Sequence, residues 1–529
     1  MSTNGITRRD LLKIGAVGAV GGALTLSGFA KMAADAGQAD AAVAATSGGA
    51  PLADPVELAL TTVAGGVREG SLSVAETDLR LGGSAARLLA YNGSVPGPLV
   101  RVRSGDALRL HVRNGLAAGG DNPLGERRGV TNLHTHGWHV SPADPADNAM
   151  RRLEPGDSWT YTYDLGRQPA GTLGWYHPHV HGLVAEQLWG GLAGPLVVDD
   201  PTDALSDYET HVLVLKDFTI VGGRPAPYAS PMDYMMGKVG ATVTVNGQVA
   251  PELAARPGSV QRWRLLNAST ARFYRVALDD HTLAVIGSDG GLLDKPYGLT
   301  ELLLAPGERA DLLVKVAATP GAYRLRTLPY SRGGMMGGGM MGGGGMMGGG
   351  MMGGGGMMGG GTTPQATLMT LRVSGSKAIE TLPATIDPTA QRARPDLSAA
   401  VRRRFVLGMG MGRGYINGRD FDVDPLVVRS QLPASGDAWE VWTIANATGM
   451  DHPWHQHTNP AQVLSVSGGD AGYAALYTQA PAWKDTVIVP RGGSVTQLVK
   501  VSDWRGMAMF HCHIVEHEDI GMLGVWQID

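Results

Sequence analysis

Residues 511–522 of the 529-residue chain read His-Cys-His-Ile-Val-Glu-His-Glu-Asp-Ile-Gly-Met. In a β-strand, side chains at positions i and i+2 point to the same face of the sheet. His511 and His513 would therefore project together, and Cys512 between them would project to the opposite face. Cys512 is the only cysteine in the sequence, so it cannot form an internal disulfide. The segment therefore predicts a strand that offers metal ligands on both of its faces.

Three further histidine clusters upstream repeat this spacing. They are His134-Thr-His136, His177-Pro-His179-Val-His181 and His452-Pro-Trp-His455-Gln-His457. Together with the last cluster they offer four pairs of imidazoles that lie side by side, and each pair can clamp one metal ion or bridge two. Imidazole is a good ligand for copper, which leads the first-row divalent metals in affinity. One such pair is more often structural than a metal site, but four pairs, one of them around the only cysteine, predict a centre with several copper ions.

The opposite face of the segment at 511–522 predicts a second kind of copper site. Cys512, His517 and Met522 can close around a metal ion together with His452 from the third cluster. A thiolate, two imidazoles and a weak thioether form the ligand set of a blue-copper electron-transfer site. Because Cys512 lies between two histidines of the last cluster, only peptide bonds would separate this site from the imidazole pairs.

The rest of the sequence has the pattern of short β-strands. Residues 98–103, 107–112 and 159–163 alternate apolar and polar side chains. Turn signals such as Asn92-Gly93 and Pro155-Gly156 separate these runs. Alternation with a period of two and regular turns is typical of β-sandwiches or barrels, not of helices.

The order of turns and strands repeats, which predicts several similar domains. An Asn246-Gly247 turn leads to a strand ending at Asn267, and an Asn417-Gly418 turn leads to a strand ending at Asn446. A chain of 529 residues is long enough for about three compact domains. We therefore expect three β-sandwich domains, at residues 52–200, 205–375 and 398–529.

With these residues in place, the sequence resembles the multicopper oxidase family. Residues 134–137, 175–182, 452–457 and 511–522 are similar to the four copper signatures of that family. The resemblance is to three-domain bacterial laccases and cuprous oxidases. It implies an all-β fold of three cupredoxin-like Greek-key β-sandwich domains, with a trinuclear copper site between the first and the third. It also implies four copper ions. The type 1 copper would bind His452, Cys512, His517 and the axial Met522, and the type 2 copper would bind His134 and His455. One type 3 copper would bind His136, His177 and His513, and the other would bind His179, His457 and His511.

The resemblance also implies an oxidase whose partners are dioxygen and a small reducing substrate. Electrons taken from the substrate at the type 1 copper would pass through Cys512 to the trinuclear site, where dioxygen is reduced to water. This reaction needs protons, and buried carboxylates are common donors. Glu518 directly follows a type 1 ligand, where related oxidases have an acid, and Asp147 follows the first cluster, with Asp144 as the alternative. We therefore predict catalytic roles for Glu518 and Asp147.

Residues 1–50 are predicted to form a twin-arginine signal and a linker. Arg8-Arg9 precedes a mildly apolar stretch at residues 14–30, which is too short and too glycine-rich for a membrane anchor. We therefore expect a protein that the twin-arginine machinery exports, periplasmic or extracellular and without a stable membrane anchor. The net charge of −4 is spread without long runs of one sign, which argues against a nucleic-acid partner. We expect a monomer.

A tract of glycines and methionine pairs occupies residues 333–361. Its flanks, residues 323–328 and 366–373, alternate like two strands, so we expect the tract to be a loop at the tip of a hairpin in the second domain. Thioethers prefer Cu(I) to harder ions, which favours a role in collecting Cu(I). The alternative is a low-complexity insertion without function. The methionines concerned are Met335, Met336, Met340, Met341, Met346, Met347, Met351, Met352, Met357 and Met358.

Three functions are compatible with these features. The favoured one is an enzyme that oxidises Cu(I) and serves copper tolerance. The second is a laccase-like oxidase of phenols or bilirubin-type pigments. The third is a protein that sequesters Cu(I), and the complete ligand set of a trinuclear site argues against it because storage needs no such site.

Overall fold

The structure, a computed structural model, describes residues 49–199, 205–334, 362–434 and 436–529. Within these ranges β-strands predominate and the helices are short, so the fold is all-β, as predicted. The predicted export signal lies outside the described residues, and so do the methionine pairs from Met335 to Met358. No helix in the described ranges is long and apolar enough to cross a membrane.

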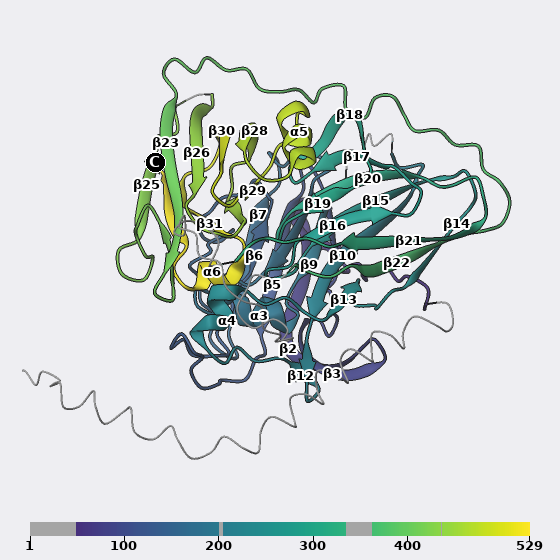
Figure 1. Cartoon of the computed structure of the whole chain (residues 1–529). Coiled ribbons are helices and arrows are strands. Elements are labelled where there is room, and N and C mark those ends of the chain that lie inside the picture. Colours follow the sequence, from purple (N-terminus) through teal and green to yellow (C-terminus); the bar gives the residue numbers. More distant parts are fainter. Residues whose placement is uncertain (1–48, 200–204, 335–361, 435) are drawn as a thin grey trace, which may run out of the picture. The chain divides into compact units, whose positions relative to one another are not determined.

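The first domain is a sandwich of two sheets (Figure 1). Its elements are β1 (Thr61–Thr62), η1 (Ala64–Gly66), β2 (Arg68–Leu81), β3 (Ser84–Tyr91), β4 (Val100–Arg103), β5 (Ala107–Asn114), β6 (His134–His136), β7 (Ser158–Asp164), β8 (Leu173–His177), α3 (Val184–Gly190) and β9 (Gly194–Asp199). One sheet has the order β1-β2-β5-β7 with β3 paired to β2, and the other has the order β4-β9-β8-β6. Leu108 and Leu110 of β5 are buried in one cluster with Val100 and Val102 of β4, so alternating side chains of the two sheets form the core.

The second domain repeats this arrangement with larger sheets. Its elements are β10 (Glu209–Phe218), β11 (Ile220–Val221), β12 (Arg224–Pro225), α4 (Pro231–Met236), β13 (Thr242–Val245), β14 (Glu252–Ala255), β15 (Val260–Asn267), β16 (Tyr274–Leu278), β17 (Leu283–Ser288), β18 (Gly291–Leu299), β19 (Leu302–Leu304), β20 (Arg309–Lys315), β21 (Gly321–Leu328) and β22 (Ala366–Val373). The sheets have the orders β13-β10-β15-β20-β17-β18 and β14-β22-β21-β16-β19, and β11 pairs with β12. The antiparallel pairing of β21 with β22 confirms the predicted strands on either side of the methionine tract.

The third domain has a core rich in aromatic side chains. Its elements are β23 (Val401–Gly410), β24 (Arg413–Ile416), β25 (Leu426–Ser430), β26 (Ala438–Asn446), β27 (His452–Gln456), β28 (Ala461–Ser467), α5 (Ala471–Gln479), β29 (Thr486–Val489), β30 (Ser494–Val501), β31 (Gly506–Cys512), α6 (Val515–Asp519) and β32 (Leu523–Ile528). The sheets have the orders β24-β23-β26-β30-β28 and β25-β32-β31-β27-β29. Between them Trp442 packs edge-on against Trp526 with ring centroids 4.6 Å apart, and Trp454 stacks on Phe510 at 5.1 Å.

Shared turns and strand pairs show that the three domains are repeats of one fold. Asn92, Asn246 and Asn417 have φ angles of 50°, 52° and 55°, and the glycine after each also has a positive φ, as a type I′ turn requires. In one sheet of each domain the parallel pairs are β2 with β5, β10 with β15, and β23 with β26. In the other sheet they are β4 with β9, β14 with β22, and β25 with β32. The fold is therefore three cupredoxin-like Greek-key β-sandwiches, while the ranges 52–200, 205–375 and 398–529 stay predictions.

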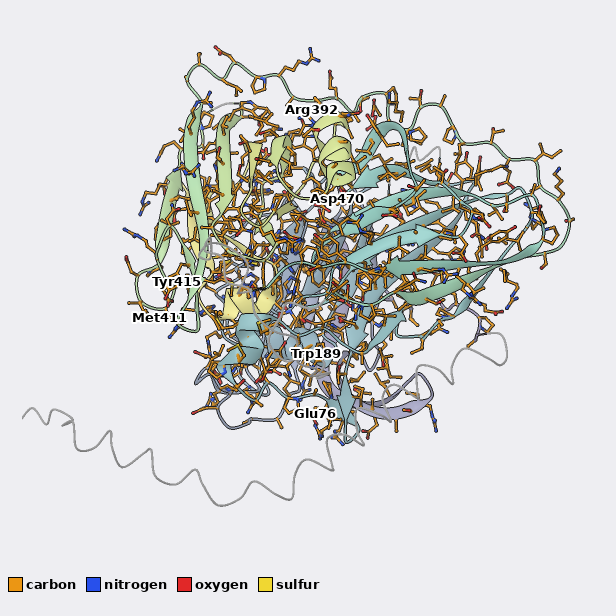
Figure 2. All side chains as sticks on the ribbon, in the orientation of Figure 1. Glu76, Trp189, Arg392, Met411, Tyr415 and Asp470 are labelled. Atoms are coloured by element: carbon orange, nitrogen blue, oxygen red, sulfur yellow. The ribbon has the colours of Figure 1, made fainter. Side chains whose placement is uncertain are left out.

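Contacts around α5 are among those that tie the second domain and the following linker to the third domain. Asp470 caps α5 by accepting the N–H of Tyr473 at 2.8 Å, and it also pairs with Arg275 of β16 at 2.8 Å. In the linker, Arg392 donates to backbone carbonyls of the third domain, at 2.6 Å to Val463 and at 2.9 Å to a residue that follows α5. Figure 2 shows Asp470 and Arg392 near α5. These bonds hold the second domain against the side of the third.

Candidate metal centre

Two pairs of adjacent strands, together with the residues just after them, carry the predicted imidazoles. In the first domain β6 pairs with β8, and His134 lies opposite His177. In the third domain β27 pairs with β31, and His455 lies opposite His511. Side chains two residues apart share a face of a strand, so each strand pair directs its histidines to one side of its sheet. Local alternation thus builds one histidine cluster on each of the two domains.

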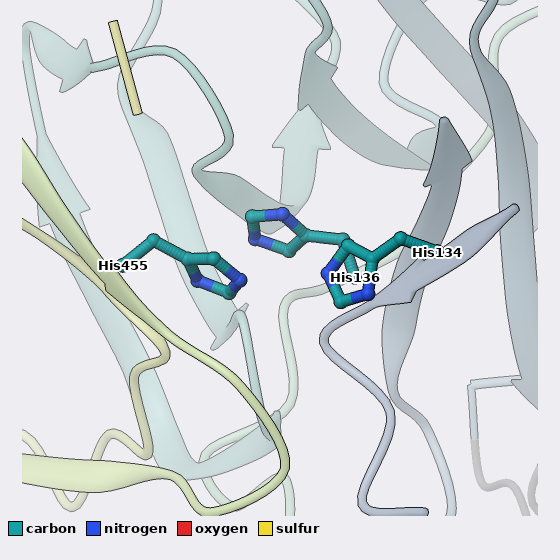
Figure 3. Close-up of side chains that lie close together, drawn as sticks. All are labelled: His134, His136 and His455. Atoms are coloured by element: carbon teal, nitrogen blue, oxygen red, sulfur yellow. The ribbon is translucent and has the colours of Figure 1, made fainter. Parts of the chain in front are cut away.

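The two clusters face each other between the first and third domains. The ring of His136 stacks on that of His455 with centroids 3.7 Å apart, and His134 stacks on His457 at 4.0 Å. Figure 3 shows His134 and His136 of β6 together with His455 of β27. All eight predicted imidazoles meet here, and each is buried. They are His134, His136, His177, His179, His455, His457, His511 and His513.

Three groups of these imidazoles have ring nitrogens close enough to share a metal ion. Within each group, one nitrogen from each residue lies within 4.8 Å of the others. Two of the groups have the membership predicted for the type 3 ions, namely His136, His177 and His513, and His179, His457 and His511. The third group adds His136 to the predicted type 2 pair, His134 and His455.

Several of these ring nitrogens have no hydrogen-bond partner among the described residues. They are Nε2 of His134, His177 and His455, Nδ1 of His136, and both ring nitrogens of His513. Leaving a buried polar atom unpaired costs about 1–3 kcal/mol, so a group of them calls for a ligand. Burial also lowers the pKa of His136, His177 and His513 well below the usual range, so these rings are neutral, which is the form that binds a metal. The donor atoms and their charge state both fit bound metal ions.

In three of these rings, those of His134, His177 and His455, the other ring nitrogen, Nδ1, is hydrogen-bonded to the protein. Nδ1–H of His134 donates to Oδ2 of Asp147 at 2.8 Å, and that of His177 donates to a backbone carbonyl at 2.8 Å. Nδ1–H of His455 donates to the backbone carbonyl of Asp485 at 3.0 Å. Such a bond fixes the tautomer and the orientation of a metal-binding imidazole. In these three rings the unpartnered Nε2 is therefore the nitrogen with a lone pair available to a metal.

Cys512 forms a separate group with His452 and His517. Its Sγ lies 3.3 Å from Nδ1 of His452 and 3.6 Å from Nδ1 of His517, and these two nitrogens are 3.2 Å apart. Their Nε2 atoms bond elsewhere, at 2.7 Å to the hydroxyl of Thr448 and at 3.3 Å to the carbonyl of Met235 in α4. Burial raises the pKa of the Cys512 thiol, so formation of the thiolate requires a bound cation. These three atoms fit one metal ion.

Met522 is buried beside this group. Its carbonyl accepts the N–H of Cys512 at 3.1 Å, and its own N–H donates to the carbonyl of His517 at 2.9 Å. Gly414 of β24 packs closely against it, because a Cβ on Gly414 would lie only 2.7 Å from Cβ of Met522. The backbone of Met522 thus lies next to two residues of the cysteine group, which is compatible with the predicted axial role.

One short segment contributes to both kinds of group. Cys512 belongs to the cysteine group, whereas its neighbours His511 and His513 belong to two different imidazole groups. In the strand ladder Cys512 lies opposite Trp454, and His511 lies opposite the next residue of β27. This is the two-sided arrangement that strand alternation predicts.

Glu518 lies beside one of the imidazole trios. Its Oε2 is 3.1 Å from Nδ1 of His511, and its Oε1 is 3.4 Å from Nε2 of His179. Neither oxygen has a hydrogen-bond partner among the described residues, and the side chain is fully buried. Burial, reinforced by Asp519, raises the pKa of Glu518 well above its usual range. The carboxyl group is therefore able to hold a proton next to the trio.

Asp147 and Asp144 have different surroundings. Asp147 is buried and accepts hydrogen bonds from Nδ1 of His134 and from the N–H of Thr135, both at 2.8 Å. Burial alone would raise its pKa, but these partners lower the pKa of Asp147 below the usual value. Asp144 is exposed and pairs with Arg151. The structure therefore places Asp147, not Asp144, against a predicted ligand, as an ionised group that holds the ring.

Three buried charged residues near the centre are absent from the sequence-based prediction. Asp485 accepts Nε2–H of His136 at 2.9 Å, and Arg309 donates to Asp485 at 2.7 Å. Asp519 accepts three backbone N–H groups at the start of α3, two at 2.7 Å and one at 3.3 Å, and its burial raises its pKa to about 7. Aspartate and arginine are mostly surface residues, and no local spacing distinguishes Asp485 and Arg309 from the others in the chain, whereas Asp519 directly follows Glu518 in the segment at 511–522.

Most of the chain is similar to known proteins. Three family models described as multicopper oxidase match residues 73–203, 175–337 and 388–529. The chain is 26% identical over 451 residues to "Multicopper oxidase mco" of Staphylococcus aureus, a match that covers 84% of each chain. A structure of the laccase-like multicopper oxidase CueO from Ochrobactrum sp. is 30% identical, with a TM-score of 0.71 over 90% of this chain and 100% of that one. A multicopper oxidase from Campylobacter jejuni, described as a metallo-oxidase, is 25% identical, with a TM-score of 0.74 over 91% of this chain and 96% of that one.

The family matches and the geometry agree. The relatives match along most of the chain, from the first domain to the third. Eight imidazoles are gathered between the first and third domains, and the sulfur of Cys512 lies with two further imidazoles inside the third domain. Imidazole and thiolate are ligands that suit copper. Proteins of this family use dioxygen and a reducing substrate. The chain is an oxidoreductase that belongs to the multicopper oxidase family.

Proposed function

We propose that the chain oxidises Cu(I) at a type 1 copper and reduces dioxygen to water at a trinuclear copper site, and that it serves copper tolerance. Bound copper would supply the one-electron redox chemistry that protein side chains lack. The support for four copper ions is the set of buried nitrogens without partners and the separate cysteine group. The proposed ligands are His452, Cys512, His517 and Met522 for type 1, His134 and His455 for type 2, and His136, His177, His513, His179, His457 and His511 for type 3.

The residues between the two sites have distinct roles in this proposal. Cys512 is joined by peptide bonds to His511 and His513, so the backbone at the end of β31 gives electrons a short covalent path between the sites. Glu518 holds a proton on its carboxyl group and donates it towards the trinuclear site from the oxygen nearest His511. Asp147 keeps the ring of His134 in one tautomer.

The observation that favours Cu(I) as the substrate concerns the residues just before the methionine pairs. Gly333 forms a β-bridge with Met450, and the N–H of Gly334 donates to the carbonyl of Gly449 at 3.1 Å. His452, a proposed type 1 ligand, follows Met450 by two positions. The described end of the tract is thus bonded to the loop that leads into the type 1 site.

The residues after the methionine pairs return to the same place. Thr363 forms a β-bridge with Tyr330, and its N–H donates to the carbonyl of Tyr330 at 2.8 Å. The hydroxyl of Tyr330 in turn donates to Asp451, the residue before the type 1 ligand, at 2.8 Å. Both described ends of the tract therefore meet next to the proposed type 1 site. A chain of thioethers that starts and ends there would deliver Cu(I), the ion that thioethers prefer.

Serine substitution of the ten methionines tests the role of the tract, because it removes the thioethers and keeps the length. We expect a higher KM or a lower kcat for Cu(I) and fewer Cu(I) ions bound per chain. Oxidation of a small organic donor and the content of the four catalytic coppers should stay unchanged. Oxygen consumption with each donor and Cu(I) titration measure these quantities.

A matched control removes exposed methionines elsewhere. Met150 in the first domain and Met507 at the start of β31 are both partly exposed, and Met150→Ser with Met507→Ser should leave Cu(I) kinetics unchanged. Unaltered Cu(I) kinetics and unaltered Cu(I) binding in the tract variant would contradict the proposal for Cu(I).

The second candidate is a laccase-like oxidase of phenols or bilirubin-type pigments. It is favoured by the relative from Ochrobactrum sp., which is described as having oxidase activity towards lignin model compounds and lignosulfonate. Met411, in the turn between β23 and β24, is fully exposed (Figure 2), and β24 packs on the buried Met522, so an exposed turn lies at the end of the strand that covers the proposed type 1 site. A bulky phenol that is consumed faster than Cu(I) in the same assay would favour this candidate. Absence of oxygen consumption with either donor would favour a Cu(I)-sequestering protein instead.

The proposal includes export through the twin-arginine machinery to the periplasm or beyond, and action as a monomer. It rests on the resemblance of residues 7–13 to a twin-arginine signal. Lysine in place of both Arg8 and Arg9 should keep the protein in the cytoplasm, which cell fractionation measures. Export of that variant would contradict this part of the proposal.

A further inference from the structure

The second domain contributes no imidazole to the described clusters, yet one of its turns reaches them. This turn, residues 305–309, precedes and begins β20, and Gly307 within it has a φ of +86°. A Cβ on Gly307 would lie 3.0 Å from Cγ of His513 and 3.1 Å from Cε1 of His136. Glycine suits both the backbone conformation and the narrow space. The turn therefore packs directly against two imidazoles of one proposed type 3 trio.

Arg309, the last residue of the turn, is fully buried and uses all five of its N–H groups. Three bonds go to backbone carbonyls: Nε donates to Leu173 at 2.8 Å, Nη1 to Gly307 at 3.0 Å and Nη2 to Asp289 at 3.1 Å. The other two go to the carboxylate of Asp485, where Nη1 donates to Oδ1 at 2.7 Å and Nη2 donates to Oδ2 at 2.5 Å. The acceptors come from all three domains. The two bonds to Asp485 form the bidentate arrangement that suits arginine and that lysine cannot reproduce.

Asp485, which Arg309 holds in place, is hydrogen-bonded to His136, a proposed copper ligand. Its Oδ1 accepts Nε2–H of His136 at 2.9 Å, while the hydroxyl of Thr486 lies 3.1 Å from the same nitrogen. An ionised carboxylate can only accept hydrogen bonds, so it favours the tautomer of His136 that carries its proton on Nε2. Nδ1 of His136, which has no partner among the described residues, is then the nitrogen with the free lone pair.

The residue after His136 is a glycine, which leaves room for the guanidinium of Arg309. Gly137 follows His136 and has a φ of +85°, and a Cβ there would lie 2.1 Å from Nη2 of Arg309. Any side chain at this position would displace Arg309 from Asp485. A salt bridge that merely joined the second and third domains would not need this close approach to the strand of a copper ligand.

We propose that Arg309 and Asp485 are positioning residues of the trinuclear site, through which the second domain sets the tautomer and the orientation of His136. Arg309 holds the carboxylate of Asp485 at two points, and Asp485 holds the ring of His136 so that Nδ1 faces the metal. This inference rests on the proposed copper assignment.

The test compares copper binding in three variants with matched chemistry. Asp485→Asn keeps the shape but removes the charge, and its amide presents a donor to either Arg309 or His136. Arg309→Lys keeps the charge and removes the bidentate fork. The control is Asp311→Asn, which disrupts another buried pair of the second domain, Asp311 with Arg262 at 2.6 Å, without a bond to any imidazole of the centre.

We expect the first two variants to bind one copper about 10- to 100-fold more weakly than the unsubstituted protein, the usual effect of removing an outer hydrogen bond from a metal-binding histidine. Copper content after dialysis against a graded chelator measures this. The blue absorption from Cys512 should persist, because neither residue bonds to the cysteine group. EPR should show a new copper signal, since a coupled pair of copper ions is silent and a single remaining ion is not.

Asp311→Asn should retain all four copper ions with unchanged affinity, and only the melting temperature of its metal-free form should fall. A double variant separates a positioning role from a general loss of stability. If Asp485 acts through His136, Asp485→Asn should cause little further copper loss in a His136→Ala background, because effects within one linked unit are not additive.

Wild-type copper affinities in Asp485→Asn and Arg309→Lys, with only a loss of stability like that of the control, would overturn the inference. If Asp485→Asn does not fold, the milder Arg309→Lys decides. Fewer than four copper ions or no blue absorption in the unsubstituted protein would instead contradict the proposed function, so the two failures are distinguishable.

Discussion

Asp147 and Asp144 lie three positions apart in the sequence, and the structure predicts that asparagine at the two positions has very different consequences. In Asp147→Asn the side chain keeps its shape but has one carbonyl oxygen and one NH2 group. The native carboxylate accepts from Nδ1–H of His134 and from the N–H of Thr135, both at 2.8 Å. The amide can satisfy only one of these donors, and its NH2 group must face the other.

The size of the effect follows from burial. Asp147 is buried, so loss of one of its hydrogen bonds leaves a donor unpaired at about 1–3 kcal/mol. Since the affected ring is that of His134, type 2 copper affinity should fall about 10- to 100-fold. Asp144 is 42% exposed in its ion pair with Arg151, and such a surface pair contributes about 0–1 kcal/mol. Asp144→Asn should therefore leave copper binding unchanged.

Two measurements check this pair of variants. Copper content after chelator dialysis reports the affinity, and urea unfolding of the metal-free proteins reports the stability. The pKa of Asp147 is lowered in the folded state, so its contribution to stability is present at neutral pH and is lost as pH falls through that lowered pKa. The difference in unfolding free energy between the native protein and Asp147→Asn should thus shrink in acid.

Equal copper loss in both variants would refute the reasoning, since only Asp147 bonds to a proposed ligand. The same holds if Asp147→Asn keeps native type 2 affinity while its unfolding free energy falls. In that case Asp147 would contribute to folding and not to the orientation of His134.

Two further predictions concern the two sides of the segment at 511–522. Cys512→Ser should abolish the blue absorption and substrate oxidation, while the metal-free protein loses less than about 2 kcal/mol of stability. A variant that stays blue in the absorption spectrum would disprove the assignment, because the chain has no other cysteine. Glu518→Gln should keep its copper and its colour but lower kcat roughly 10²- to 10⁴-fold, because the amide has no acidic proton to donate. Burial raises the pKa of Glu518, so the native rate should fall as pH rises through that pKa, and a pH–rate profile with the same fall in Glu518→Gln would assign the titration to another group.

The sequence by itself determined the elements of the site that depend on local geometry. Side chains of a strand alternate between its faces whatever the rest of the protein does, so His511-Cys512-His513 must serve two sides. The Asn-Gly turns and alternating runs likewise identified the β-strands, and the structure confirms the all-β fold. The resemblance to multicopper oxidases supplied the expected grouping of ligands, and the structure gathers the two predicted type 3 trios.

The tertiary structure alone decided which charged residues surround those ligands. His136 bonds to Asp485, 349 positions away, and Arg309 reaches Asp485 from a different domain, 176 positions away. The choice between Asp147 and Asp144 also depended on which carboxylate is buried. Strand alternation carries no information on such pairings, because it repeats over two residues, whereas these contacts arise where the three sandwiches meet. A buried aspartate or arginine has the same letter in the sequence as a solvated one, and only packing between domains distinguishes them.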